Sequence, residues 1–128
     1  MKKKAILCVD DEALMLLSLK TSLSRNLGEN FIYETAINAE QAWEIIEDFH
    51  RDGIELILII SDWLMPGIKG DQFLIDVHSK YPEIKAIMLS GQIEEKYIEK
   101  VKKEANLIGF FSKPCKEKEL VKCIKENI

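Results

Sequence analysis

The 128-residue sequence has few of the features that would set it apart from ordinary globular proteins. Its 6 glycines and 3 prolines fall below the usual combined share of about 12%, which argues against a loop-dominated or low-complexity chain. Its 3 cysteines, Cys8, Cys115 and Cys123, are odd in number and form no CxxC pair. They therefore support neither a disulfide framework nor a zinc knuckle, and a reducing compartment is the default expectation.

Long hydrophobic runs and an excess of basic charge are also missing. The apolar stretch Ala5–Val9 ends in acid and is shorter than the roughly 7–15 residues of a secretory signal. The longest apolar run, Leu56–Ile60, cannot cross a bilayer. With 18 basic and 22 acidic side chains the formal charge is −4, which argues against direct nucleic-acid binding by this domain. We therefore expect a cytoplasmic protein without membrane attachment.

The sequence does contain an alternation of strand-like and helix-like segments. Each strand-like run precedes a segment with helical spacing of apolar residues. The five runs are Ala5–Val9, Phe31–Ile37, Leu56–Ile60, Ala86–Leu89 and Leu107–Phe111. Asn38 and Gln41 have the spacing of a capping box before the second helix, and Pro82 ends the third. This pattern predicts one α/β domain over residues 1–128, a doubly wound five-stranded parallel sheet with helices on both faces.

The composition of the strands indicates their order. Ala5–Val9, Leu56–Ile60 and Ala86–Leu89 are apolar throughout, as expected for strands covered on both faces. Residues 31–35 alternate between apolar and polar, which is typical of an edge strand. With right-handed crossovers the predicted order is 2-1-3-4-5, which is the order of flavodoxin-like sheets. Its switch point lies between the first and third strands, where ligands bind beyond the carboxyl ends.

Polar side chains stand at the carboxyl ends of four of these strands. Asp10 and Asp11 follow the first strand, Asp62 the third, Ser90 the fourth and Lys113 the fifth. Converging carboxylates repel one another unless a cation joins them, and an all-oxygen ligand set favours Mg²⁺. The sequence also lacks the glycine-rich turn after the first strand that a dinucleotide site needs.

With Mg²⁺ bound, one of these carboxylates can act as a nucleophile toward phosphorus. Asp62 is the best placed, because it follows a buried strand and precedes the Pro66-Gly67 turn. Lys113 can meet a phosphoryl oxygen as a point charge, and the Ser90 hydroxyl can donate to another. Catalysis would then consist of positioning and charge neutralisation.

These residues resemble the receiver domain of two-component response regulators, over nearly the whole chain from Ala5 to the last helix. Four motifs carry the resemblance, each weak alone but specific in this order at the ends of these strands. They are Val9-Asp10-Asp11-Glu12, Ser61-Asp62-Trp63-Leu64-Met65-Pro66-Gly67, Leu89-Ser90-Gly91 and Ser112-Lys113-Pro114. The resemblance implies that Asp62 accepts a phosphoryl group from a histidine kinase or phosphotransfer protein. It also implies no enzyme activity beyond self-catalysed phosphotransfer and autodephosphorylation.

The same resemblance implies roles for individual residues in binding Mg²⁺. Asp11 and Asp62 would bind Mg²⁺ directly, together with the backbone carbonyl of Leu64. Asp10 would act largely through water.

Roles in phosphoryl binding and switching are implied as well. Lys113 and Ser90 would contact the phosphoryl group, and Phe110 matches the switch aromatic of the family. A cis peptide is often found before the residue that matches Pro114. The fourth helix, the fifth strand and the last helix would form the surface read by a downstream effector or output domain, or by a second copy in a phosphorylation-dependent homodimer.

Two further positions are expected to tune the lifetime of the phosphoryl group. Leu64 and Gln92 each lie two residues after a site residue and flank the path of an attacking water. We expect Leu64 to slow hydrolysis by excluding that water. Ser90 stands where threonine is frequent in the family, so the hydroxyl is kept and a methyl group is lost.

Two other functions remain open at this point. A receiver-like interaction module would signal through its contacts without phosphate, although the intact Asp10, Asp11, Asp62 and Lys113 argue against it. A Mg²⁺-dependent phosphatase with a transient aspartyl phosphate would need a second acid two residues after the nucleophile, where this chain has Leu64.

Overall fold

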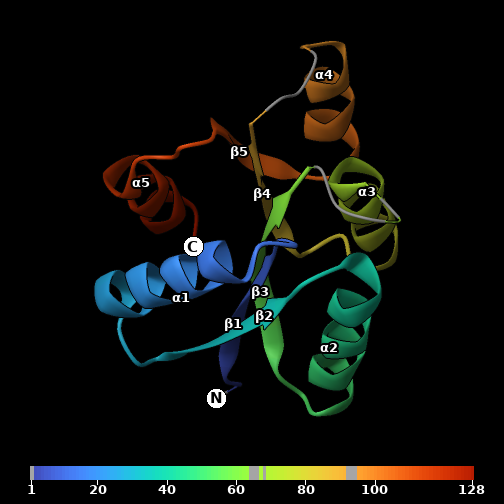
Figure 1. The fold of residues 1–128 in the computed structure, drawn as a ribbon. Helices are drawn as coiled ribbons and strands as arrows, with labels where there is room; N and C mark the ends of the chain where they lie inside the picture. Colours follow the sequence, from blue (N-terminus) through green and yellow to red (C-terminus); the bar gives the residue numbers. More distant parts are fainter. Residues whose placement is uncertain (1, 64–66, 68, 92–94) are drawn as a thin grey trace.

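The computed structural model is a five-stranded parallel sheet with helices on both faces (Figure 1). It describes residues 2–63, 67, 69–91 and 95–128, without the side chains of 95–97. Strands and helices alternate as β1 (Lys4–Val9), α1 (Ala13–Leu27), β2 (Phe31–Ala36), α2 (Ala39–Arg51), β3 (Glu55–Asp62), α3 (Gly70–Lys80), β4 (Lys85–Ser90), α4 (Glu95–Glu104), β5 (Leu107–Ser112) and α5 (Glu117–Asn127). The strand order is β2-β1-β3-β4-β5, so the predicted fold and strand order are confirmed.

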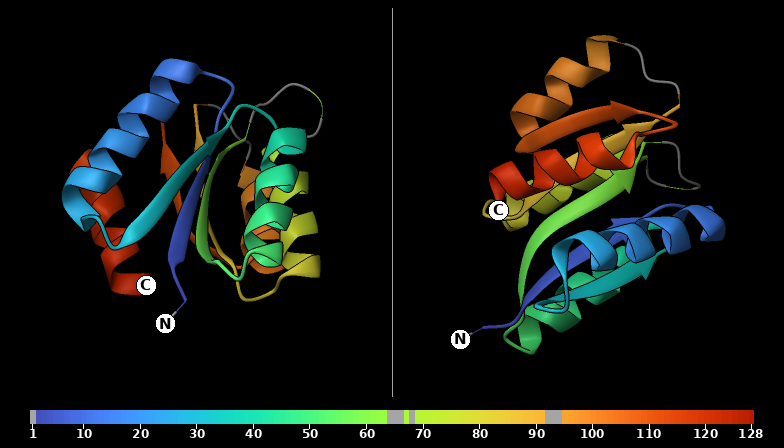
Figure 2. Two further views of the ribbon diagram at one scale, coloured as in Figure 1. Left: turned by 90° about the horizontal axis from the view of Figure 1, so that it is seen from below. Right: turned by 90° about the vertical axis from the view of Figure 1, so that its left-hand side faces the viewer.

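The sheet separates two apolar cores, because successive side chains of a strand point to opposite faces. In β1, Ile6 and Cys8 lie in one core, whereas Leu7 and Val9 lie in the other. Helices α1 and α5 cover the first face, and α2, α3 and α4 cover the second (Figure 2). This double cover explains why β1, β3 and β4 are apolar along almost their whole length.

The two edge strands differ in how their sequences report their position. In β2, Glu34 is exposed and Tyr33 is buried, so the alternation in the sequence marks the edge. In β5, every residue from Leu107 to Phe111 is half-buried although the run is apolar. Gly109 lets α5 approach β5 closely, since a Cβ there would lie 2.9 Å from the Sγ of Cys123.

The start of α2 and the end of α3 agree with the sequence-based predictions, apart from one hydrogen bond at the start of α2. The N–H of Gln41 donates to Asn38 Oδ1 at 2.7 Å, as a capping box requires. The return bond, however, runs from the N–H of Ile37 to Gln41 Oε1 at 2.8 Å, one residue earlier than in the standard motif. Helix α3 ends at Lys80, before Pro82, as predicted.

Candidate functional site

Three carboxylates meet at the carboxyl end of the sheet. Oxygens of Asp10, Asp11 and Asp62 all lie within 4.8 Å of one another. Asp10 and Asp62 are only 1% and 7% exposed, whereas Asp11 reaches solvent. They come together because β1 and β3 are neighbours in the sheet, although the whole of α1, β2 and α2 lies between them in the chain. Asp62 is the last residue of β3, which extends beyond the predicted run Leu56–Ile60, whereas the sequence placed Asp62 after the strand.

Lys113 joins two of these carboxylates. Its Nζ lies 2.9 Å from Asp10 Oδ2 and 3.3 Å from Asp62 Oδ2. Burial of this ammonium group favours its neutral form, but the hydrogen bond and charge of Asp10, with a smaller contribution from Asp62, outweigh that effect. The pKa of Lys113 is therefore raised above its ordinary value. The lysine stays charged and partly offsets the repulsion between the carboxylates.

Backbone hydrogen bonds hold the strand ends that carry these side chains. The N–H of Asp10 donates to the carbonyl of Ala36 at 3.0 Å, and that of Lys113 donates to the carbonyl of Ser90 at 2.8 Å. The side chain of Asp10 also accepts a hydrogen bond from the N–H of Glu12 at 2.9 Å. This last bond fixes the Asp10 carboxylate just before the start of α1. Asp10 therefore both stabilises the local turn and belongs to the site.

The backbone of Asp62 is fixed by Ser61 and Gly70, two residues to which the sequence assigned no role. The Ser61 hydroxyl donates to the Asp62 carbonyl at 3.0 Å. A Cβ on Gly70 would lie 2.0 Å from that same carbonyl oxygen, which no structure tolerates. The N–H of Gly70 donates to the carbonyl of Trp63 at 2.8 Å, so the chain after β3 returns to the end of the strand. A glycine at a helix start is too common to have indicated this contact.

The remaining predicted residues lie around this centre or outside the described part of the chain. Ser90 is 2% exposed and ends β4, beside β3 on the same edge of the sheet. Phe110 is half-buried and packs against the core beneath α2, α3 and α4. The Lys113–Pro114 peptide bond is cis. Leu64 and Gln92 lie outside the described residues.

The donor set of this site fits a hard divalent cation. All three acidic groups offer oxygen, and Mg²⁺ binds oxygen ligands at about 2.0–2.1 Å with near-octahedral geometry. Asp11 faces solvent, which leaves room for the water molecules that Mg²⁺ usually keeps. Lys113 would remain beside a phosphoryl group placed over Asp62.

Comparison with known protein families identifies the family to which this chain belongs. The model of the response regulator receiver domain matches residues 6–125. This chain belongs to the response regulator receiver family. The receiver domain is a signalling domain of two-component systems, and such domains are generally not enzymes. They act through histidine kinases and through the output domains or effectors that they control.

This receiver domain matches parts of longer proteins. It is 29% identical over 127 residues to the hydrogenase transcriptional regulatory protein HoxA of Cupriavidus necator, covering 99% of this chain and 24% of HoxA. It is 31% identical over 127 residues to the uncharacterized transcriptional regulatory protein YesN of Bacillus subtilis, covering 96% of this chain and 32% of YesN. The sensor kinase CckA of Brucella abortus is 29% identical over 123 residues, covering 96% of this chain and 12% of CckA. The chain thus spans less than a third of the length of these relatives.

Solved structures show the same fold. The signal receiver domain of an HD domain-containing protein from Pseudomonas fluorescens Pf-5 superimposes with a TM-score of 0.85 at 27% identity, covering 98% of this chain and 94% of that one. A CheY-like receiver domain protein from Methanospirillum hungatei JF-1 gives a TM-score of 0.81 at 28% identity, covering 96% and 91%. Within the part of the chain that the structure describes, no helix has the length and apolar character needed to cross a membrane.

Proposed function

We propose that Asp62 of this receiver domain accepts a phosphoryl group from a histidine kinase or phosphotransfer protein. A carboxylate oxygen of Asp62 attacks the phosphorus of a phosphohistidine, and the P–N bond breaks with its electron pair returning to the imidazole. The product is an acyl phosphate on Asp62. Mg²⁺, held by Asp11, Asp62 and the backbone carbonyl of Leu64, with Asp10 acting through water, would neutralise charge on the phosphoryl oxygens.

The observation that carries this proposal is the position of Lys113. Its ammonium group contacts the buried Asp10 and Asp62 at once, at 2.9 and 3.3 Å. A purely structural lysine gains little by entering a buried site with two carboxylates, because desolvation of the charges opposes it. A lysine that must also meet the phosphoryl group on Asp62 needs this place. The Ser90 hydroxyl, buried on the neighbouring strand, would donate to the same group.

Phosphorylation would then be passed to the surface formed by α4, β5 and α5. The phosphoryl group adds negative charge and acceptor oxygens at Asp62. Ser90 and Lys113 would be drawn toward it and would shift Phe110 in β5 between two pre-existing states. An effector, an output domain or a second copy of the receiver would read the altered surface. HoxA and YesN, which are named as transcriptional regulators, are consistent with an output that acts on transcription.

The remaining expectations belong to the same proposal. Residues 1–128 form one receiver domain that works in the cytoplasm, with no direct nucleic-acid contact of its own. Phosphotransfer and autodephosphorylation are self-catalysed, and Leu64 and Gln92 tune the lifetime of the acyl phosphate. Leu64→Asn is expected to speed dephosphorylation, measured as loss of phosphate from the labelled domain. An unchanged rate would remove Leu64 from this role.

Mass spectrometry after incubation with acetyl phosphate and Mg²⁺ tests the proposal against its two rivals. We expect a stable increment of one phosphate that is absent in Asp62→Ala. Turnover of acetyl phosphate without accumulation would support the Mg²⁺-dependent phosphatase. An unchanged mass would support an interaction module that works without phosphorylation.

A further inference from the structure

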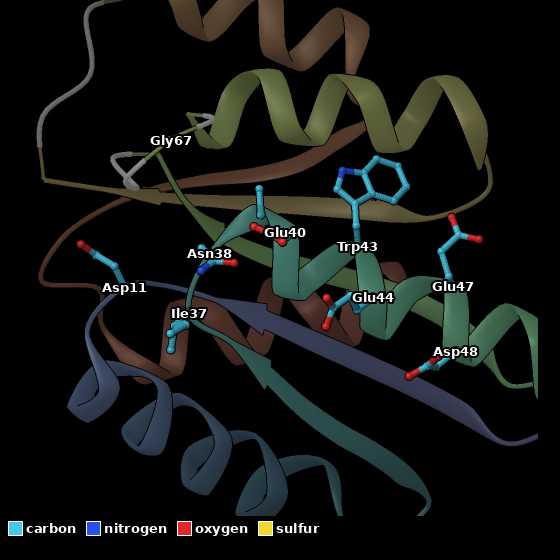
Figure 3. A pocket seen from close by; sticks show the side chains of 10 residues that line it. Asp11, Ile37, Asn38, Glu40, Trp43, Glu44, Glu47, Asp48 and Gly67 are labelled. Carbon is cyan, nitrogen blue, oxygen red and sulfur yellow. The ribbon is translucent and has the colours of Figure 1, made fainter.

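A groove of about 1100 Å³ runs along the outer side of α2, beside the phosphorylation site (Figure 3). Figure 3 shows Ile37 at the end nearest the start of α2, and Glu47 and Asp48 at the other end. Trp43 lies between these ends, and its side chain is half-buried where α2 meets α3. The surface of the groove is mostly apolar, and Ile37 is 50% exposed. This groove therefore offers an apolar strip that the described part of the domain leaves open.

The charged residues that line the groove, among those that the structure describes, are all acidic. The described lining residues include Glu40, Glu44, Glu47 and Asp48 from α2 but no lysine, arginine or histidine. Two of these carboxylates are already paired, Glu47 with Lys80 and Asp48 with Arg51. Glu40 and Glu44 are exposed and have no ion-pair or hydrogen-bond partner among the residues that the structure describes.

The spacing of the two unpaired carboxylates makes them an unfavourable pair. Glu40 and Glu44 are four residues apart on α2, so they lie one above the other on the same side of the helix. Like charges in this arrangement destabilise a helix. Both side chains line the same groove as Trp43, its largest apolar residue. A cationic group bound between them would remove the repulsion.

The far end of the groove already shows how a cation binds there. Lys80 of α3 lies with its Nζ 2.7 Å from Glu47 Oε1 and 5.9 Å from the centre of the Trp43 ring. The ammonium group thus combines an ion pair with the face of an aromatic ring. Glu40 and Glu44 also line the groove, and neither is paired with a lysine among the described residues.

We propose that this groove binds a basic segment of a partner protein. Two lysine or arginine side chains, about one helical turn apart, would pair with Glu40 and Glu44. An apolar side chain of the segment would cover Ile37 and the open edge of Trp43. A small cation would satisfy the charges but leave this apolar strip exposed, which is why a peptide segment fits the groove better.

The test uses the unphosphorylated full chain without Mg²⁺. The probe is a short, blocked synthetic peptide with lysines and leucines at helical spacing, and its affinity is measured by calorimetry. We expect Glu40→Gln combined with Glu44→Gln to weaken binding about tenfold, as expected for the loss of two ion pairs beside an apolar contact. The matched control, Glu29→Gln with Glu34→Gln, removes two exposed carboxylates elsewhere and should change the affinity less than about twofold.

Two further measurements locate the peptide. In a Trp63→Phe background the remaining fluorescence comes from Trp43 and should change on binding. In NMR spectra, the backbone amide chemical shifts that change on peptide binding should belong mainly to residues 37–48. The proposal fails if both double variants weaken binding equally, if the shifts gather on another face, or if no binding occurs. It also fails if sedimentation shows that the groove joins two copies of this chain. Because the assay contains no phosphoryl donor, none of these outcomes bears on Asp62.

Discussion

At their amino ends the three central strands begin with charged side chains that reach water, whereas at their carboxyl ends they place polar side chains inside the protein. Lys4 and Glu55 are exposed and Lys85 is half-buried at the starts of β1, β3 and β4. At the other end, Asp10, Asp62 and Ser90 are all less than 10% exposed. In the same sheet, water solvates the charges at the amino end, whereas the charges at the carboxyl end are buried.

The difference between the two ends of the sheet indicates which end carries the functional site. Burying a carboxylate costs free energy unless hydrogen bonds and an opposite charge offset it. At the carboxyl end, one lysine contacts two buried carboxylates, and a third carboxylate stands nearby. Among the described residues, the amino end of the sheet contains no such buried charges. The cation and the phosphoryl group proposed above would complete this arrangement.

The largest contrast is expected between glycines at the two ends. Gly70→Ala would push the new Cβ against the Asp62 carbonyl and slow phosphorylation by acetyl phosphate by more than about hundredfold, because small displacements of reacting groups are costly. Gly53, before β3, has open space around it but a φ of +72°, so Gly53→Ala should cost about 1 kcal/mol of stability. It should leave the phosphorylation rate of the folded protein unchanged. Rates measured by mass spectrometry on both variants decide the point, and a normal rate for Gly70→Ala would refute it.

The lysines at the two ends should differ as well. Lys113→Ala removes the cation that contacts Asp10 and Asp62, and we expect phosphorylation to slow by roughly ten- to hundredfold. Lys85 donates to the backbone carbonyl of Asn127 at the opposite end of the sheet. Lys85→Ala should therefore change stability slightly and the rate hardly at all. Equal rates for the two variants in a stopped-flow assay with acetyl phosphate would contradict this assignment.

Magnesium should stabilise the folded domain, and this stabilisation should depend only on residues at the carboxyl end of the sheet. At a concentration one hundred times its dissociation constant, a ligand that binds only the folded state adds about 2.7 kcal/mol. The melting temperature should then rise by several degrees with MgCl₂, and Asp11→Asn should abolish most of the rise. Glu55→Gln, at the exposed amino end, should keep it. Calorimetric scans with and without MgCl₂ make the comparison, and a full rise in Asp11→Asn would argue against the proposed ligand.

A pH-dependent effect on stability is expected in alkaline solution. The pKa of Lys113 is raised in the folded protein, so the unfolded chain loses this proton first and the stabilisation disappears as pH rises above about 10.5. Burial raises the pKa of the Cys8 thiol from 9.0 to about 12, so its contribution begins to fall near pH 9. Urea unfolding between pH 8 and 12 should show a smaller decline at pH 9–10.5 for Cys8→Ala. Lys113→Met should reduce the decline only above that range, and identical slopes in both variants would show that other groups control it.

Much of the fold followed from local patterns in the sequence. Continuous apolar runs marked β1, β3 and β4 as covered on both faces, and the alternation in β2 marked an edge. Given the strand order, the meeting of Asp10, Asp11 and Asp62 was predicted as well, because parallel strands end at one edge of the sheet. The apolar run of β5 did not reveal its edge position, since a half-buried strand and a covered one can have the same composition.

Other features of the site depend on contacts between distant residues. The closeness of Gly70 to Asp62 arises where the chain after β3 returns to the strand, and no local pattern encodes that distance. The ion pair of Lys80 with Glu47, and the lack of one at Glu40 and Glu44, follow from how α3 packs beside α2. A sequence lists the charges of these helices but not which of them will meet.

By itself the sequence determined the alternation of strands and helices, the order of the strands and the residue types delivered to the carboxyl edge of the sheet. These depend on hydrophobic periodicity and on the handedness of crossovers, which act over short stretches of chain. Only the tertiary structure decided which carboxylate Lys113 contacts most closely, how tightly Gly70 approaches Asp62 and which acids of α2 stay unpaired. Such distances are set by the packing of whole elements against one another, to fractions of an ångström that no local pattern specifies.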